Sequence, residues 1–160
     1  MAKNFRGFEV IKEYKDKSIV MPERKTLKSA GYDISSAETY ILEPKTCYLI
    51  PTGLKAYMLD NEFLSLYIRS SMAIKYNLSL TNSVAIIDSD YYNNPDNEGH
   101  IMIGIRNNSD EPFLLEKGTR IAQGVFMSYG IIDGDKAYRT RVGGIGSTGL
   151  GKWGTIHLPK

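Results

Sequence analysis

Five short polar segments along this chain hold residue types that bind anions or move protons. They lie at residues 29–34, 69–71, 82–91, 118–123 and 141–149. The last is rich in glycine, whose backbone N–H groups can approach a ligand closely, and it adds Arg141 and the hydroxyl groups of Ser147 and Thr148. This combination favours a polyphosphate ligand. The alternative is a disordered glycine-rich terminus that binds nothing.

Two other segments join a charged side chain to a turn or to the start of a helix. Arg69, Ser70 and Ser71 follow an expected strand and open an expected short helix, where free N–H groups attract anions. The alternative is an ordinary helix cap beside a solvated arginine. Asp33 follows the glycine of the first segment, and the alternative there is a turn aspartate without a functional role.

The remaining two segments adjoin apolar strands. Asp88, Asp90 and Tyr91 close an apolar run, and an aspartate that is ionised at neutral pH can accept a proton or orient a water molecule. Gln123 lies near the start of another apolar strand, and the alternative there is an edge strand with outward polar positions. The two histidines stand apart from each other and from Cys47, so we expect no zinc site.

Composition limits the class of protein further. The 160 residues fit one domain, and 20 Lys+Arg against 18 Asp+Glu is too balanced for wholesale binding to nucleic acid or membrane. Neither a leader sequence nor an apolar run of membrane-spanning length is evident. The single cysteine, Cys47, lies in an apolar run where we expect a buried thiol, and it favours a reducing compartment. We therefore expect a cytoplasmic protein without direct nucleic-acid or membrane partners.

Short strands must position these segments. Period-two alternation predicts strands at 63–68 and 101–106, with further strands near 8–11, 39–42, 47–50, 83–87, 113–115 and 121–129. Residues 71–76 are expected to form a short helix capped by serine. Many short strands separated by turns favour an all-β sandwich or barrel. Residues 82–91 are expected to be one arm of a hairpin, and 91–99 a long exposed hairpin loop.

In this order, the five segments resemble the five motifs of the trimeric dUTP pyrophosphatases. The matching stretches are Ala30-Gly31-Tyr32-Asp33-Ile34, Arg69-Ser70-Ser71-Met72-Ala73, Ile87-Asp88-Ser89-Asp90-Tyr91, Gly118-Thr119-Arg120-Ile121-Ala122-Gln123 and Gly143-Gly144-Ile145-Gly146-Ser147-Thr148-Gly149. Together they span most of the chain. The details look most like the dUTPases of staphylococcal and other Gram-positive bacteriophages, which carry a comparable Asn/Pro-rich extension of the third motif.

The resemblance implies an all-β, jelly-roll protomer with one short helix and a C-terminal arm. Residues 1–138 would form the β domain, and the arm at 139–160 would close the active site of a neighbouring subunit in a homotrimer. The implied activity is the hydrolysis of dUTP to dUMP and pyrophosphate, with Mg²⁺ as the cofactor. Substrate phosphates would hold most of the metal's ligand positions.

The resemblance also implies a role for each matching residue. Asp88 would activate the attacking water, and Asp33 would hold water around the metal. Tyr91 would lie against the deoxyribose and exclude a 2′-hydroxyl group, while Asn82 would face the uracil edge. The full substrate-binding set that it implies is Arg69, Ser70, Ser71, Asn82, Tyr91, Gln123, Arg141, Ile145, Gly146, Ser147 and Thr148.

Three departures from the family pattern leave alternatives open. Ile145 stands where the family usually has an aromatic ring that stacks on uracil. The usual place of the arm's arginine, position 140, is threonine, so Arg139 and Arg141 are both candidates and we prefer Arg141 because it lies nearer the motif. The extension at 92–98 could be a lid, a partner-binding epitope or a neutral insertion.

Two other functions compete with dUTP hydrolysis. One is a dCTP deaminase of the same fold. Asp88 and Tyr91 argue against it, because they stand in the arrangement of the dUTPases. The other is a non-catalytic protein that binds a repressor of mobile pathogenicity islands, as related phage dUTPases do. Repressor binding can also coexist with hydrolysis.

Overall fold

The computed structural model describes residues 4–145, and the regular secondary structure within that range consists mainly of β-strands. The expected all-β class is confirmed. None of the described helices is long and apolar enough to span a membrane. The elements are β1 (Gly7–Val10), η1 (Lys12–Tyr14), β2 (Tyr32–Ser35), β3 (Tyr40–Leu42), β4 (Cys47–Pro51), β5 (Leu54–Tyr57), β6 (Glu62–Ile68), α1 (Ser70–Tyr76), β7 (Leu78–Leu80), β8 (Ala85–Asp88), η2 (Ser89–Tyr91), β9 (Met102–Asn107), β10 (Phe113–Leu115) and β11 (Arg120–Ser128).

Two larger antiparallel sheets enclose one core. The first has the strand order β2-β11-β6-β8 and the second β4-β9-β7, while β1 pairs with β5 and β10 with β3. Alternate residues of each strand face inward, so Leu64 and Leu66 of β6 meet Ile103 and Ile105 of β9 in the same buried cluster. The central strands β6 and β11 are therefore held from both sides, and they carry much of the candidate site.

Alternation found most of the strands but not all of their partners. Strands β2, β5 and β7 are absent from the expected set. Asp33 of β2 is a residue type typical of turns, Lys55 interrupts the apolar pattern of β5, and β7 has only 3 residues. The hairpin expected from residues 82–91 and a loop at 91–99 is wrong. Strand β8 pairs with β6 whereas β9 pairs with β4 and β7, and residues 81–84 cross from one sheet to the other. The alternation of apolar residues determines which face of a strand is buried, but it does not determine which strand pairs beside it.

Two local expectations are also wrong. Cys47 is exposed, because it shares the outward face of β4 with Leu49 while Ile50 points into the core. The N-cap of α1 is Arg69, which has extended backbone angles and makes no side-chain capping hydrogen bond, so serine does not cap this helix. The Arg69 carbonyl instead accepts the first helical hydrogen bonds, from the N–H groups of Met72 and Ala73.

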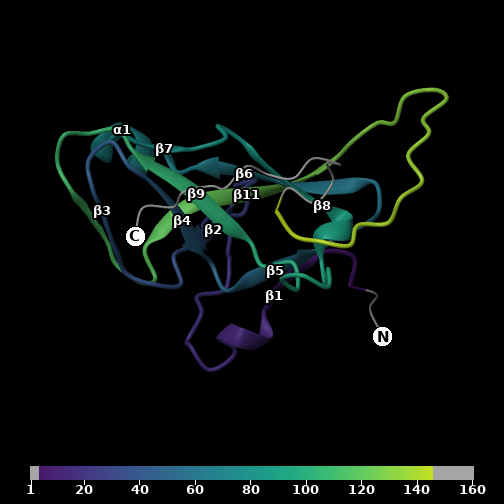
Figure 1. Cartoon of the computed structure of the whole chain (residues 1–160), viewed down its shortest axis with the longest axis horizontal. Coiled ribbons are helices and arrows are strands. Elements are labelled where there is room, and N and C mark those ends of the chain that lie inside the picture. Colours follow the sequence, from purple (N-terminus) through teal and green to yellow (C-terminus); the bar gives the residue numbers. More distant parts are fainter. Residues whose placement is uncertain (1–3, 146–160) are drawn as a thin grey trace.

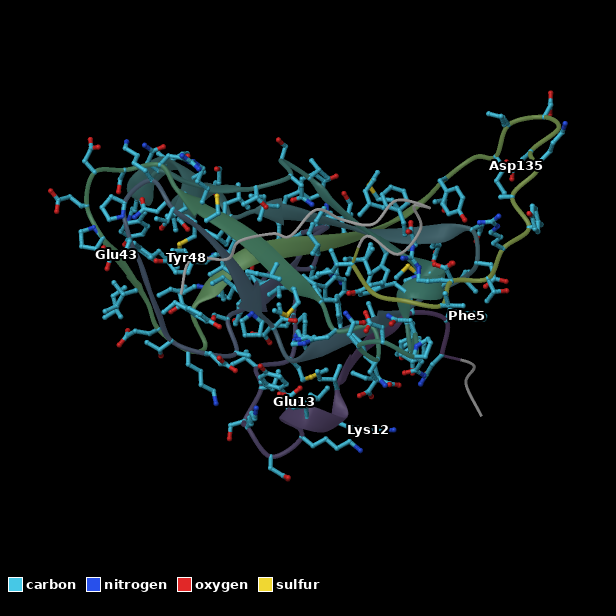
Figure 2. The ribbon with its side chains drawn as sticks, viewed as in Figure 1. Phe5, Lys12, Glu13, Glu43, Tyr48 and Asp135 are labelled. Atoms are coloured by element: carbon cyan, nitrogen blue, oxygen red, sulfur yellow. The ribbon has the colours of Figure 1, made fainter. Side chains whose placement is uncertain are left out.

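The chain after β11 leaves the sheets and then returns to them. Figure 1 shows this segment swinging away from the body, and Asp135 lies far out on it in Figure 2. Ile131, Ile132 and Tyr138 are exposed along the way. The chain then comes back beside β8, where Arg141 is almost buried. The domain boundary expected at 138/139 stays a prediction.

Candidate active site

The first pocket is built around Asp33, and we call it the β2 pocket. Strand β11 lies between β2 and β6, and its register places Gln123 opposite both Asp33 and Tyr67. The side chain of Asp33 is only 13% exposed, and its Oδ1 and Oδ2 pair with the Arg69 Nε at 3.2 Å and the Arg120 Nη1 at 2.8 Å. A cavity of about 210 Å³ opens here, lined by Lys25, Ser29, Gly31, Asp33, Arg69, Ser70 and Gln123.

A glycine shapes this pocket. A Cβ atom on Gly31 would collide with the Oε1 atom of Gln123, so the missing side chain lets the Gln123 amide lie against the backbone of residue 31. The pocket thus presents an amide, a serine hydroxyl and cationic side chains around one carboxylate. Such a donor-rich surface suits an anionic ligand that carries several oxygen atoms.

The second pocket lies at the end of β8, and we call it the β8 pocket. Its cavity of about 520 Å³ has apolar walls and a polar end. Such a mixture suits a flat, partly apolar ligand with a few polar groups. The lining residues are Leu49, Thr81, Asn82, Ala85, Ile86, Ile87, Asp88, Tyr91, Met102, Gly104, Arg141, Gly144 and Ile145.

Arg141 closes the polar end of the β8 pocket. Its Nη2 donates to the Asp88 Oδ2 at 2.5 Å and its Nε donates to the Asp90 Oδ1 at 2.7 Å. The guanidinium carbon also lies 5.6 Å from the centre of the Tyr91 ring, within reach of a cation–π interaction. Although it comes from an irregular segment, the Arg141 side chain is only 8% exposed. In this state the carboxylate of Asp88 is therefore engaged by a cation.

Tyr91 forms a buried wall beside these charges. Its hydroxyl donates to the His100 carbonyl at 3.0 Å and accepts from the Asn97 Nδ2 at 2.7 Å. Burial raises the pKa of Tyr91 above its usual value, and the Asn97 hydrogen bond and the Arg141 charge oppose that rise. The phenol is therefore neutral at physiological pH, and it uses its single O–H donor inside the protein.

The segment that follows Tyr91 is folded more tightly than expected. The Asn94 side chain is buried, and its Oδ1 accepts from the N–H groups of Asp96 and Asn97 at 3.1 Å each. Gly99 has a φ of +85°, and a Cβ atom there would lie 2.7 Å from the Tyr91 carbonyl oxygen. The expected exposed hairpin loop is therefore an ordered turn with a buried asparagine at its centre.

The two pockets lie at opposite ends of β6. Asp88 pairs with Phe63 near the start of that strand, whereas Arg69 follows its last residue. Six residues of strand separate the two positions, which corresponds to about 20 Å. Figure 1 accordingly places β8 and α1 toward opposite ends of the molecule. One chain cannot bring Asp88 and Arg69 to the same phosphate group.

The sequence-predicted residues divide between these pockets. The β2 pocket holds Asp33, Arg69, Ser70 and Gln123, and the β8 pocket holds Asn82, Asp88, Tyr91, Arg141 and Ile145. Ser71 is not among the residues lining either one. Gly146, Ser147 and Thr148 lie outside the described residues.

Sequence reasoning missed three contributors to the pockets. Arg120 was noticed only as part of a strand start, although it neutralises Asp33. Lys25 reaches the β2 pocket because its segment runs beside β2, where Glu23 bridges to Asp33. Asn97 was counted only as loop composition, and no signal in the sequence assigned its amide to Tyr91.

A metal cage is not evident among residues 4–145, where no group of three or more His, Cys, Asp or Glu side chains could hold an ion. Both oxygens of Asp33 are already paired with arginines. The donor set therefore fits a hard cation only if that ion arrives with its own phosphate and water ligands.

Comparison with known proteins supplies the family. The model of the dUTPase family matches residues 17–149. The chain belongs to the dUTPase family. It is 54% identical to the deoxyuridine 5'-triphosphate nucleotidohydrolase of Lactococcus lactis over 146 residues, which is 90% of this chain and 97% of that protein. The predicted family and enzyme class are confirmed.

Solved structures confirm the jelly-roll fold of this family. A dUTPase from Streptococcus mutans has a TM-score of 0.76 and 48% identity, covering 80% of this chain and 99% of that one. The dUTPase of Staphylococcus bacteriophage 80alpha has a TM-score of 0.68 and 26% identity, covering 86% and 98%. Phage dUTPases share the fold, but the two bacterial proteins share about twice as much of the sequence, so the expectation that this chain looks most like the phage enzymes is wrong.

Proposed function

We propose that this chain hydrolyses dUTP to dUMP and pyrophosphate at sites shared between the subunits of a homotrimer. The observation that carries the proposal is the division of the site into two pockets of different chemistry. The β8 pocket suits a nucleoside and contains the carboxylate of Asp88, and the β2 pocket suits a phosphate chain. The family supports the substrate.

The distance between the pockets supports a shared site. A triphosphate bound by Arg69 and Gln123 of one subunit needs the carboxylate of a different subunit, because its own Asp88 lies about 20 Å along β6. Closed rotational symmetry would repeat such a contact and complete every site. In this arrangement the trimer is a requirement of the chemistry rather than an addition to it.

Asp88 would act as the proton acceptor. Its carboxylate holds a water molecule whose oxygen attacks the α-phosphorus, the bond between the α and β phosphates breaks, and pyrophosphate leaves with its electron pair. The proton lost by the water goes to the Asp88 carboxylate. Tyr91 would support the deoxyribose from one side of the same pocket, and Asn82 would face the base.

Arg141 must change partners before that step. In the described state its guanidinium holds both Asp88 and Asp90. The phosphate chain of a bound nucleotide offers a planar cation stronger bidentate acceptors, and it would draw Arg141 away from Asp88. Nucleotide binding would thereby free the carboxylate for the water.

The β2 pocket would position the phosphates. Arg69, Ser70 and Gln123 would contact phosphate oxygens, while Asp33 holds the arginines in place and faces the metal's water shell. When bound on the triphosphate, Mg²⁺ would neutralise charge on the phosphate oxygens. Each of these residues binds or orients, and none needs to move a proton.

Mixing inactive subunits tests the proposal. Asp88→Asn and Arg69→Gln chains should each be nearly inactive. If one site takes Asp88 and Arg69 from different chains, trimers refolded from a 1:1 mixture should regain about a quarter of wild-type activity, because each residue is intact with a probability of one half. A mixture that stays inactive while forming trimers would contradict the shared site.

A substrate panel separates the competing enzyme. Pyrophosphate and ammonia release should be measured in parallel from dUTP, dCTP, dTTP and UTP. The proposal requires pyrophosphate from dUTP above all others, because a site built to pair with uracil leaves its polar groups unpaired against cytosine. Ammonia from dCTP would establish the deaminase instead.

Repressor binding is the second candidate function, favoured by the exposed tip of the ordered turn. Asn93, Pro95 and Asp96 are exposed, and they line a cavity of about 660 Å³ that is separate from the β2 and β8 pockets. One structure of the phage 80alpha enzyme is described in terms of control of virulence-gene transfer. Replacing Pro95 with a bulky charged residue should weaken the binding of a candidate repressor and leave dUTP turnover unchanged. Unchanged repressor binding would exclude this surface as the binding site.

A further inference from the structure

We propose that Asn97 is a positioning residue that locks the Tyr91 phenol, and that the lock sets the preference for deoxyribose over ribose. The inference rests on the proposed function, in which Tyr91 lies against the sugar. It gives the Asn-rich turn at 92–99 a role inside the site. That role is distinct from the partner-binding epitope considered above.

The orientation of the Asn97 amide is fixed by three hydrogen bonds. Its Oδ1 accepts from the Asn94 Nδ2 at 2.8 Å and from the Gly99 N–H at 3.1 Å. With the oxygen so occupied, the amide nitrogen must point the other way, and it donates to the Tyr91 hydroxyl at 2.7 Å. Asn97 is therefore a donor toward the phenol and cannot be exchanged for an acceptor.

The single O–H donor of the phenol is consequently used inside the protein. The hydroxyl accepts from Asn97 and gives its proton to the His100 carbonyl, so its O–H donor is no longer available to a ligand. Tyr91 thus offers the pocket a ring surface and no free O–H donor. A 2′-hydroxyl group pressed against that surface would lose its water without gaining a partner, whereas a 2′-deoxy carbon would lose nothing.

The turn can serve as a rigid support because a buried lysine anchors it. The Lys55 side chain is only 9% exposed, and its Nζ donates to the Asn93 Oδ1 and to the Glu98 Oε1, each at 2.7 Å. Glu98 also accepts from the backbone N–H of Lys12, which Figure 2 shows at the edge of the molecule. The hydrogen bond to Lys55 holds the pKa of Glu98 below its usual value.

The same turn meets the C-terminal segment as it enters the pocket. The Gly144 N–H donates to the Asp96 Oδ2 at 3.1 Å. A Cβ atom on Gly144 would lie 2.9 Å from the Asn97 Nδ2, so the backbone of the segment rests directly on the amide that holds Tyr91. Asn97 therefore lies between the sugar wall and the closing segment.

The test is a double-mutant cycle between Asn97 and Tyr91, and the quantity measured is the preference for dUTP over UTP. Asn97→Asp keeps the shape and the two acceptor contacts but removes the donor to the phenol. In the wild-type background it should lower the ratio of kcat/KM for dUTP over UTP by about tenfold or more, the scale of a lost buried hydrogen bond. In a Tyr91→Phe background, the same substitution should change the ratio less than about twofold.

Controls separate positioning from general damage. Asn108→Asp is a matched change at an asparagine that donates to Ser79 and lines neither pocket, and it should leave the ratio unchanged. If Asn97→Asp does not fold, Tyr91→Phe alone must relax discrimination, because it removes the locked hydroxyl from an intact turn. Equal losses for dUTP and UTP, or full additivity in the Tyr91→Phe background, would overturn the proposal.

The proposed function fails independently of this inference. If the wild-type chain releases no pyrophosphate from dUTP, hydrolysis is wrong, and the ratio of dUMP to UMP affinity then measures the lock by itself. That ratio should fall in Asn97→Asp by the same factor. An unchanged affinity ratio would exclude the lock even in an inactive protein.

Discussion

The two pockets contain the same kinds of charged side chain, arginine and aspartate, in opposite arrangements. In the β2 pocket one carboxylate, Asp33, lies between Arg69 and Arg120, and all three come from strands or their ends. In the β8 pocket one guanidinium, Arg141, lies between Asp88 and Asp90, and it comes from an irregular segment. The first cluster has an excess of one positive charge and the second an excess of one negative charge.

The arginines of the β2 pocket are held in place, whereas Arg141 of the β8 pocket can leave its carboxylate partners. Backbone hydrogen bonds fix the β2 cluster, because Asp33 and Arg120 lie within the paired strands β2 and β11 and the Arg69 N–H donates to the Ile121 carbonyl. No ladder holds Arg141, so its two ion pairs can exchange for a ligand's phosphates. The fixed cluster suits permanent phosphate binding, and the exchangeable one suits a carboxylate that must be free only when substrate is present.

The largest effect should come from Asp88. Asp88→Asn keeps the shape and removes the proton acceptor, so kcat should fall by about 10²–10⁴ while nucleotide binding persists. The matched control is Asp90→Asn, which removes the other partner of Arg141 and should cost less than about tenfold. Steady-state pyrophosphate release measures both, and equal losses would show that charge near Arg141 matters rather than proton transfer.

The second-largest effect on activity should come from Arg141. Arg141→Gln loses one charge-assisted phosphate contact, which should lower kcat/KM for dUTP by about ten- to a hundredfold. Arg139, whose guanidinium lies over the ring of Tyr138, is the matched control, and Arg139→Gln should have little effect. The reverse order of the two losses would assign the phosphate contact to Arg139.

The contrast between the pockets also marks how far the sequence could lead. Asp33, Arg69, Ser70 and Gln123 were recognisable because each adjoins a strand whose alternation or turn residues are clear, and the ladder then brings them together. The separation of Asp88 from Arg69 was not predictable from alternation. It depends on which strand β8 pairs with, and pairing partners are set by tertiary packing.

The turn at 92–99 shows a second limit to prediction from the sequence. Residues 92–99 have the composition of an exposed turn, and Asn is common in such turns. Burial of Asn94 and the hydrogen bond from Asn97 to Tyr91 depend on the buried Lys55, which lies 38 residues before Asn93. Only the folded chain brings that anchor to the turn.

Asp33 tests the fixed cluster by stability rather than rate. Asp33→Asn leaves two partly buried arginines without a counter-charge, so the free energy of unfolding should fall by about 1–3 kcal/mol. Asp88→Asn, whose partner comes from the irregular segment, should change stability by less than about 0.5 kcal/mol. Urea unfolding of both variants decides, and similar values would remove the distinction between the two clusters.

Mild acid should first loosen the turn between β4 and β5, where His100 accepts a hydrogen bond from Gly53. Burial lowers the pKa of His100 below its ordinary value of 6.5, and its Nε2 accepts the Gly53 N–H at 3.0 Å only when neutral. The unfolded chain therefore takes up the proton first, and this stabilisation is present above about pH 6.5 and lost as the pH falls below it. Hydrogen exchange at Gly53 should accelerate between pH 7 and 5.5 after correction for intrinsic rates, while β11 amides stay protected. A His100→Gln variant should lack this dependence.

The smallest expected effect concerns Ile145, which lines the β8 pocket but is 62% exposed. An aliphatic side chain can cover a base without stacking on it, so Ile145→Phe should tighten binding of a non-hydrolysable dUTP analogue by about 0.5–1.5 kcal/mol. Calorimetric titration measures the change, with Ile145→Leu as a control that keeps the apolar area and adds no ring. Weaker binding by the phenylalanine variant would mean that the closing segment follows a path along which residue 145 does not cover the base. Because Gly144 rests on Asp96 and Asn97, that path is set by the ordered turn, and the gain should vanish in Asp96→Ala, which lacks the acceptor for the Gly144 N–H.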